Sequence, residues 1–336
     1  MPAEPPEIEA AAFLGTPYDQ AQRKGEQATS AAEFTYIFNA KHQVTITGYT
    51  GSSSKVIIPD QIEGCLVTAI AKGAFQENQY LTEVFVPDSV VTIQGSAFKD
   101  CISLKKVRLS NNLRRIVVST FNGCIGLKEI NIPDSVCELK DNTFQDAPLE
   151  TLHIGKGLAS INTRAFYRGE YDFEGRRTGN RAIWNVSIDP QNVNLRAEGS
   201  CIFSADGRHL LAALGALTDY LVPEGVETIA EGAFSGLRSL TDIILPASLR
   251  EIGAYAFSET GLRSVSFGEN LQSIGDHAFD FCEKLTSAIF AEGLRQIGRR
   301  AFAYCPIVSV SLPASLQSLG NGSFDCLNAY NSEQRQ

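Results

Sequence analysis

Apolar residues recur along this chain with a period of 22 or 23 residues. A phenylalanine that follows a small residue marks each period, and aliphatic residues stand five and eight positions before it. The steps between these phenylalanines are regular except for one of 68 residues. A fixed period of this length is typical of repeat proteins. The ten copies in register are marked by Phe75, Phe98, Phe121, Phe144, Phe166, Phe234, Phe257, Phe279, Phe302 and Phe324.

Each unit also carries the signal of a short strand. After the phenylalanine comes a pattern of the form Leu-x-x-Val-x-Leu, as in residues 104–109 and 127–132. Its last three positions alternate with a period of two, which predicts a strand with one buried face. Proline often follows at once, as Pro133 and Pro246 do, and ends the strand where no ladder donor is needed. The 22-residue units lose one residue in a turn and keep both strands.

A single unit of this kind cannot fold by itself, because it buries too few apolar side chains to offset the entropy of ordering its backbone. Stacking solves this problem, since each coil then covers its neighbours and the backbones of successive coils pair. Helices are excluded because the stretches between punctuating Gly, Pro and Asp-Ser are too short for three turns. The pattern therefore predicts a solenoid with parallel strands about 4.8 Å apart.

The unit L-x-x-I-G-x-x-A-F-x-x-C-x-x-L-x-x-V-x-L-P resembles the BspA-like type of bacterial leucine-rich repeat. Residues 252–257 and 274–279 match it closely, and residues 44–51 resemble that family's first coil. The likeness runs from about residue 34 to residue 327. It implies a leucine-rich repeat solenoid, a β-rich right-handed superhelix of about 11 coils with parallel strands, short turns and little regular α-helix. It also implies a surface or secreted protein that adheres to host proteins, other cells or glycans.

Composition and charge narrow the location and the partners. The formal net charge of −9 gives no electrostatic reason to bind nucleic acid or an anionic membrane. No apolar run is long enough for a membrane span, so no membrane insertion is expected. The first residues lack the basic and apolar regions of a signal peptide. A cell-surface or secreted location follows from the resemblance alone, and a cytoplasmic one stays open.

The long step between Phe166 and Phe234 interrupts the repeat. The dipeptide Asp206-Gly207 between two apolar runs predicts a hairpin. Phe203 is expected to take the place of the repeat phenylalanine. We therefore predict a leader or stalk without fixed structure at 1–33, one solenoid domain at 34–327 with an irregular insertion at about 167–220, and a tail at 328–336.

The start of this insertion concentrates aromatic and arginine residues, including the single Trp of the chain. These residue types anchor protein interfaces and stack against sugars. The alternative is that they pin an enlarged loop onto the solenoid flank. The candidate partner-binding residues here are Tyr167, Tyr171, Phe173, Arg176, Arg177 and Trp184.

The second candidate binding surface is the strand face. Parallel coils set the outward side chains in ladders, which form the usual binding surface of repeat proteins. No ladder has one sign of charge or a regular aromatic stripe, and a plain solvated face is the alternative. The outward positions of interest are Phe85, Arg108, His153, Ile244 and Ile289, with Ser309 and Ser311 on the last strand.

Catalysis and metal binding find little support in the sequence. The chain has four histidines and none of the H-E-x-x-H, G-x-S-x-G, P-loop or dinucleotide-binding patterns. His277 and Cys282 lie near each other without a second pair of ligands, so we expect no metal and no cofactor. Asp276 and Asp280 flank a turn, where we expect them to serve solvation.

Four cysteines share one position, three residues after the repeat phenylalanine. Asn78, Ala147 and Thr260 take that position in other coils, which indicates selection for size, with free Cys acting as a small hydrophobe. Neighbouring coils hold the Cβ atoms slightly too far apart for a relaxed disulfide. We therefore predict reduced, buried thiols at Cys101, Cys124, Cys282 and Cys305.

These observations predict a non-enzymatic, monomeric recognition scaffold. It resembles an adhesin and binds a protein or glycan partner through its strand face and the 167–184 loop. The alternative is an intracellular scaffolding protein with the same fold.

Overall fold

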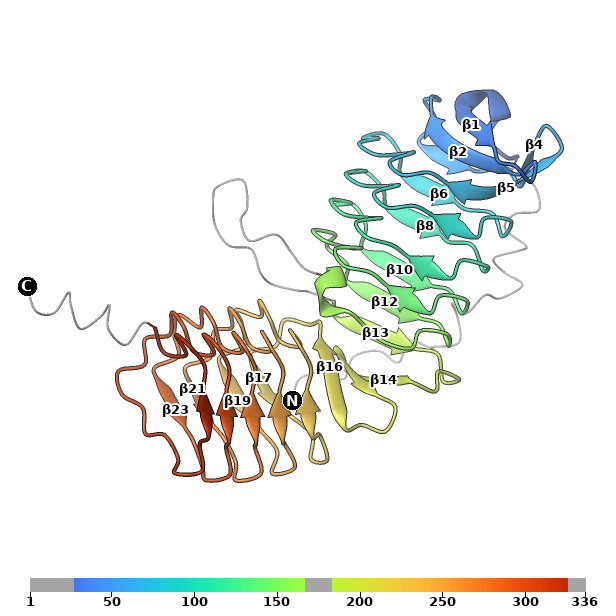
Figure 1. Cartoon of the computed structure of the whole chain (residues 1–336). Helices are drawn as coiled ribbons and strands as arrows, with labels where there is room; N and C mark the ends of the chain where they lie inside the picture. The colour runs from blue at the N-terminus through green and yellow to red at the C-terminus, as the bar shows by residue number, and fades with distance from the viewer. Residues whose placement is uncertain (1–26, 167–182, 326–336) are drawn as a thin grey trace, which may run out of the picture.

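Each repeat unit forms one turn of a β-solenoid, because its two apolar strand positions and its phenylalanine all point into the coil. The computed structural model describes residues 27–166 and 183–325. Within them the chain makes a solenoid of about 11 turns with parallel strands and almost no helix, as the repeat predicted (Figure 1). The turns stack in two arms that meet at a bend (Figure 1). We call residues 27–188 the N-terminal arm and residues 195–325 the C-terminal arm.

The N-terminal arm contains most of the irregular strands as well as the five regular coils marked by Phe75, Phe98, Phe121, Phe144 and Phe166. Its elements are η2 (Ala31–Glu33), β1 (Phe34–Phe38), β2 (Val44–Tyr49), β3 (Lys55–Ile57), β4 (Gln61–Ile62), β5 (Cys65–Ile70), β6 (Glu83–Phe85), β7 (Thr92–Ile93), β8 (Lys106–Arg108), β9 (Arg115–Ile116), β10 (Glu129–Ile132), β11 (Glu138–Leu139), β12 (Thr151–Ile154), η3 (Thr163–Phe166) and β13 (Asn185–Ile188).

The C-terminal arm opens with two antiparallel hairpins and continues as regular coils. Its strands are β14 (Leu195–Glu198), β15 (Cys201–Ser204), β16 (His209–Ala213), β17 (Asp219–Leu221), β18 (Thr228–Ile229), β19 (Asp242–Ile244), β20 (Glu251–Ile252), β21 (Ser264–Ser266), β22 (Ser273–Ile274), β23 (Ser287–Ile289), β24 (Gln296–Ile297) and β25 (Ser318–Leu319).

Parallel pairing keeps every coil in register with the next. In the C-terminal arm β16, β18, β20, β22, β24 and β25 form one ladder, so that Ile229 lies opposite Ile252 and Ile252 opposite Ile274. The outward-facing strands pair in the same way, as β3 with β6 and β6 with β8. Equal residues thus stack in columns along the solenoid, which is why a 22- or 23-residue period is enough to specify the fold.

The repeat phenylalanines form one of these columns. The rings of Phe98 and Phe121 are 5.5 Å apart with an interplanar angle of 8°, and those of Phe234 and Phe257 are 4.9 Å apart at 9°. The backbone N–H of Phe98 donates to the carbonyl of Thr120 in the next coil at 3.0 Å. These rings are buried, so the column is a continuous apolar spine in each arm.

The bend lies where the hairpins interrupt this spine. The expected hairpin across Asp206-Gly207 joins β15 to β16, and β14 pairs antiparallel with β15 as well. The expectation that Phe203 replaces a repeat phenylalanine is wrong. Phe203 pairs with Leu210, which pairs with Ile229, so Phe203 lies in the isoleucine ladder. The reversed strand direction of the hairpin brings it there.

The small side chain of Ala213 takes the vacant place in the phenylalanine column. Its N–H donates to the carbonyl of Ala233, the residue before Phe234, as a repeat phenylalanine's would. The buried apolar residues correspondingly fall into two clusters, one from Phe34 to Leu214 and one from Cys201 to Ile307. The spine is therefore broken at the bend, and the first cluster extends past it to take in Leu195, Ile202, Ala212 and Leu214 of the hairpins.

The two ends differ from the regular coils. Residues 27–33, which the sequence places in the leader, fold onto the first coil: Thr29 N–H donates to the Ile57 carbonyl at 2.9 Å, and η2 leads into β1, which pairs antiparallel with β2. At the other end the predicted strand with Ser309 and Ser311 does not form.

Candidate functional site

On the strand face of the N-terminal arm, charged side chains lie beside opposite charges on the neighbouring strands. Lys55, Glu83 and Lys106 are direct neighbours in the ladder, so positive and negative side chains alternate. The ammonium of Lys55 lies 3.9 Å from the carboxylate of Glu83. Opposite charges placed directly across a ladder stabilise the sheet rather than attract a partner.

Phe85 lies on this face but is buried, so the prediction that it is an outward-facing binding residue is wrong. Only 9% of it is accessible. The ammonium groups of Lys55 and Lys106 lie 5.2 and 5.7 Å from the centre of its ring. Both lysines come from the neighbouring strands and hold their ammonium groups over the ring, an arrangement that cation–π attraction favours.

Arg108 is also engaged within the protein. Its guanidinium donates to the carboxylate of Asp88 at 3.2 and 3.4 Å and to the carbonyl of Val86 at 3.1 Å. Burial alone would raise the pKa of Asp88, but the N–H of Asn111 and the Arg108 guanidinium outweigh it and hold that pKa below its ordinary value. Arg108 therefore stabilises the turn that follows the preceding strand, β6.

His153 is half-buried in the same ladder. Its Nδ1 is hydrogen-bonded to the Ser187 hydroxyl, and its Nε2 lies 3.9 Å from the Glu129 carboxylate. Burial lowers the pKa of His153, and Glu129 opposes that effect without cancelling it. The imidazole is thus neutral at pH 7, so the N-terminal strand face offers polar groups that already have partners.

The strand face of the C-terminal arm is different, because it exposes aliphatic side chains. Ile244 is 65% exposed and Ile289 is 61% exposed, as the sequence led us to expect. Leu221, which the sequence reasoning missed, is 64% exposed and lies directly beside Ile244 in the ladder. The signal was present, since Leu221 stands two residues before Pro223 just as Ile244 stands two before Pro246. We call Leu221, Ile244 and Ile289 the aliphatic row.

Two acidic residues border the aliphatic row. Asp219 and Asp242 are exposed, and they lie beside each other in the pair of strands β17 and β19, two residues before Leu221 and Ile244. Farther along, Ser264 and Ser287 take the same position. The surface is therefore an apolar row with an acidic margin at its end near the bend.

Of the aromatic loop, which we define as residues 167–184, the structure describes Ile183 and Trp184. Trp184 is 64% exposed at the start of β13, where its N–H donates to the carbonyl of Glu150 at 2.9 Å. Its exposed side chain directly precedes β13, the last strand of the N-terminal arm. The other candidates, Tyr167, Tyr171, Phe173, Arg176 and Arg177, lie outside the described residues.

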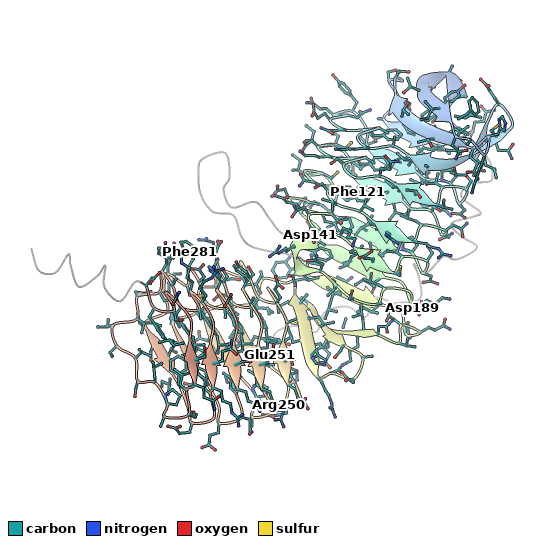
Figure 2. All side chains as sticks on the ribbon, viewed as in Figure 1. Phe121, Asp141, Asp189, Arg250, Glu251 and Phe281 are labelled. Carbon is teal, nitrogen blue, oxygen red and sulfur yellow. The ribbon has the colours of Figure 1, made fainter. Side chains whose placement is uncertain are left out.

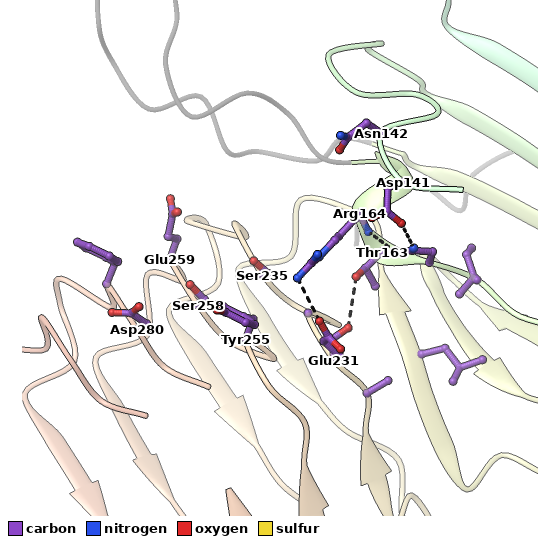
Figure 3. Close-up of a pocket in the computed structure, with 16 residues that line it drawn as sticks. Asp141, Asn142, Thr163, Arg164, Glu231, Ser235, Tyr255, Ser258, Glu259 and Asp280 are labelled. Atoms are coloured by element: carbon purple, nitrogen blue, oxygen red, sulfur yellow. Dashed lines mark hydrogen bonds and ion pairs between the residues drawn. The ribbon is translucent and has the colours of Figure 1, made fainter. Parts of the chain in front are cut away.

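A hollow of about 770 Å³ opens at the inner side of the bend (Figure 3). Asp141 and Phe281 lie along this inner side, whereas Asp189 and Arg250 lie on the outer side (Figure 2). Both arms line the hollow, which we call the elbow hollow. Its lining residues are Asp141, Asn142, Ile161, Asn162, Thr163, Arg164, Leu211, Ala230, Glu231, Gly232, Ser235, Tyr255, Ser258, Glu259, Asp280 and Phe281.

Asp280 does not serve solvation, contrary to the expectation from the sequence. It is 6% exposed, and its Oδ2 lies 2.7 Å from Nδ1 of His277. Burial raises the pKa of Asp280, and the hydrogen bond to His277 opposes that shift. Within residues 27–166 and 183–325, no group of three or more His, Cys, Asp and Glu side chains could hold a metal ion.

The cysteines that share one position in their coils have free, buried thiols, and these thiols have a structural role. Each thiol donates to the carbonyl of the repeat phenylalanine one coil earlier, as Cys101 does to Phe75 at 3.0 Å and Cys124 does to Phe98 at 3.1 Å. Cys282 and Cys305 repeat the contact at 3.1 Å. Burial raises the pKa of Cys101 to about 12. These cysteines are therefore buried structural residues whose thiols donate hydrogen bonds, and they are not nucleophiles.

The fold and its surfaces define a repeat scaffold of the leucine-rich type, and comparison with known proteins gives the family. The model of the BspA type leucine rich repeat region, with 6 copies, matches residues 49–171 and 210–330. The chain therefore belongs to the BspA-type leucine-rich repeat family. Proteins of this class are typically recognition scaffolds without catalytic activity. No curated protein matches the chain.

Solved structures share the architecture at low sequence identity. A leucine-rich repeat protein from Eubacterium ventriosum has a TM-score of 0.59 at 17% identity, over 88% of this chain and 92% of that one. The pneumococcal vaccine antigen PcpA gives 0.55 at 19%, over 86% and 69%. A leucine-rich repeat protein from Bacteroides ovatus gives 0.53 at 18%, over 89% and 93%. These likenesses concern the fold. In the part of the chain that the structure describes, no helix is long and apolar enough to cross a membrane.

Proposed function

We propose that this protein is a non-enzymatic, adhesin-like recognition scaffold that binds a protein partner through the strand face of its C-terminal arm. The observation that carries the proposal is the aliphatic row, three side chains each more than 60% exposed on a rigid β surface. Isolated exposed apolar residues are ordinary, but Leu221 and Ile244 lie side by side in one ladder, and Ile289 takes the same position two coils beyond Ile244, with the small Ser266 between them.

The row offers enough free energy for a weak but specific contact. Covering the exposed part of an isoleucine or leucine yields about 1–2 kcal/mol, so the three together supply about 3–6 kcal/mol before the cost of association. Asp219 and Asp242 beside the row would favour partners with basic residues around an apolar anchor. Because the row lies on paired strands, little side-chain or backbone order has to be gained on binding.

Capture of partners by the intact chain tests this function. The bait is compared with an Ile244→Asp/Ile289→Asp variant, and with a control in which Ser264 on the same face is changed to Asp. We expect quantitative mass spectrometry to show at least tenfold lower recovery of the specific partner with the double variant, since each charge would have to be buried in the contact. Equal recovery from all three baits, with equal thermal stability, contradicts the proposal.

The aromatic loop is part of the same proposal. Replacement of Tyr171, Phe173, Arg176 and Trp184 by Ala should weaken capture and leave the melting temperature nearly unchanged. A fall in stability with unchanged capture would instead assign the loop to packing. Cell fractionation separates a surface protein from a scaffold with a cytosolic partner.

A further inference from the structure

The elbow hollow has an aromatic wall that the repeat pattern does not require. Tyr255 and His277 occupy the second position before the repeat phenylalanine, where the backbone is left-handed, with φ of +56° at both residues. Other coils place Gly73 or Gly232 there, or Ser96, Ser119, Asn142 and Arg300, all with positive φ. Left-handed backbone costs a bulky residue about 1–2 kcal/mol. The position therefore accepts glycine and polar residues, and nothing in the repeat requires an aromatic ring at Tyr255 and His277.

The ring of Tyr255 is held from behind. It stacks on the imidazole of His277 at 4.8 Å with an interplanar angle of 5°. His277 is fixed in turn by the buried carboxylate of Asp280. On the opposite side of Tyr255 the next residue in its column is Gly232, which has no side chain. One face of the tyrosine is thus supported by a locked stack, and the other is turned toward the hollow (Figure 3).

A second aromatic stack lies beside the first. Phe281 also lines the hollow, also has a left-handed backbone, and stacks on Tyr304 of the following coil at 4.3 Å and 10°. Tyr255 and Phe281 stand on either side of the column of repeat phenylalanines. The C-terminal wall of the hollow therefore carries two rings, each braced by the coil behind it.

The charged part of the remaining lining is mostly acidic, with four carboxylates (Asp141, Glu231, Glu259 and Asp280) against the guanidinium of Arg164. On the N-terminal wall the Arg164 guanidinium lies 3.3 Å from the Glu231 carboxylate, and Asn162 donates to Asp141 (Figure 3). On the other wall Oδ1 of Asp280 is buried and has no hydrogen-bond partner in the described part of the chain. An unpaired buried carboxylate oxygen is costly until a donor reaches it. The site thus combines an excess of carboxylates over cationic groups with neutral hydrogen-bonding side chains such as Ser235 and Ser258.

We propose that the elbow hollow binds a neutral saccharide, with a hexose ring stacked on Tyr255 and its hydroxyl groups donating to the carboxylates. An aromatic face matches the C–H face of a sugar, and braced rings lose little entropy on binding. The volume of about 770 Å³ lies in the range of small-ligand sites and suits two or three sugar rings. The excess of acidic groups disfavours sialylated or sulfated sugars. This site lies apart from the aliphatic row, so it does not depend on the function proposed above.

Saturation-transfer NMR on the full chain tests the proposal. The probes are methyl glycosides of glucose, galactose, mannose and N-acetylglucosamine and their trisaccharides, each up to about 10 mM, beyond the weak-binding scale of 1 mM. The variant is Tyr255→Gly, because glycine tolerates the left-handed backbone and the protein should stay folded. The matched control is Ser96→Gly, which makes the same change to glycine two residues before a repeat phenylalanine, at a φ of +58°, in a residue that does not line the hollow.

We expect at least one neutral saccharide to bind, with affinity about tenfold or more lower in Tyr255→Gly and unchanged in Ser96→Gly. Asp280→Asn should also weaken binding. The proposal is overturned if none of the neutral probes binds, if Tyr255→Gly binds them as the native chain does, or if 3′-sialyllactose or spermidine binds in preference. The Ile244→Asp/Ile289→Asp variant should bind the saccharide normally, which separates this site from the strand face.

Discussion

Gly232 is the residue at which the contact between the two arms can be tested most directly. Its φ is +61°, and a Cβ atom at this position would lie 2.9 Å from Oγ1 of Thr163. Thr163 belongs to η3 in the N-terminal arm, is 6% exposed, and donates to the carbonyl of Glu231 at 3.3 Å. The change Gly232→Ala therefore strains the backbone and presses on the other arm at once.

The two effects can be separated with a matched variant. Gly73 has the same place in its coil and a φ of +66°, but a Cβ there would meet only the flexible side chain of Gln76, at 3.2 Å. Gly73→Ala should cost about 1–2 kcal/mol for the left-handed backbone alone. Gly232→Ala should cost the same plus about 1–3 kcal/mol for the overpacked contact with Thr163. The difference between the variants measures how tightly the arms are packed at the bend.

Urea unfolding followed by circular dichroism supplies the free energies of unfolding. Both arms must be monitored, because repeat arrays with separate cores can unfold in more than one step. Adding Thr163→Ala to Gly232→Ala should recover the excess cost. Our account of the bend is refuted if Gly232→Ala costs no more than Gly73→Ala, or if the excess persists without the threonine hydroxyl.

Two further predictions concern the columns. Phe257→Ala should lower the free energy of unfolding in urea by about 3–5 kcal/mol, because its ring is fully buried between two others. Phe324→Ala, at the half-buried end of the stack, should lower it by less than half as much. Equal losses would argue against a cooperative spine. For the thiols, native labelling resolved by peptide mass spectrometry should modify the exposed Cys137 and reach Cys101 only after denaturation. Because burial raises the pKa of Cys101 to about 12, above an ordinary value of about 8.5, its contribution to stability is intact below pH 8.5 and is lost as the pH rises toward 12. Cys101→Ala should therefore flatten the loss of stability between pH 8 and 10, and an unchanged pH profile would refute this assignment.

The sequence pattern was sufficient to predict a residue's surroundings wherever its neighbours are the equivalent residues of adjacent coils. The repeat phenylalanines, the ladder positions and the shared cysteine position could be predicted because parallel stacking converts a sequence period into a column. The exposed Ile244 and Ile289 followed from the same alternation. The hairpin at Asp206-Gly207 was predictable from turn chemistry, which acts over a few residues.

The predictions failed where a side chain's surroundings come from another strand or from the end of the array. Phe85 looked exposed by alternation, but Lys55 and Lys106 cover it from the neighbouring strands. Phe203 looked like a repeat phenylalanine until the antiparallel direction of its strand moved it into the isoleucine ladder. Asp280 looked solvated, yet the left-handed turn folds it against His277.

The sequence by itself determined the coil, its length, its columns and the family, because each of these is set by contacts that repeat every 22 or 23 residues. Only the tertiary structure decided that the array bends at β14–β16, that the bend encloses the elbow hollow, and that Tyr255 faces it. Those features depend on contacts between coils that are far apart in the sequence, such as Arg164 with Glu231. A period describes how a coil meets the next one and contains no information about how two arms meet across an interruption.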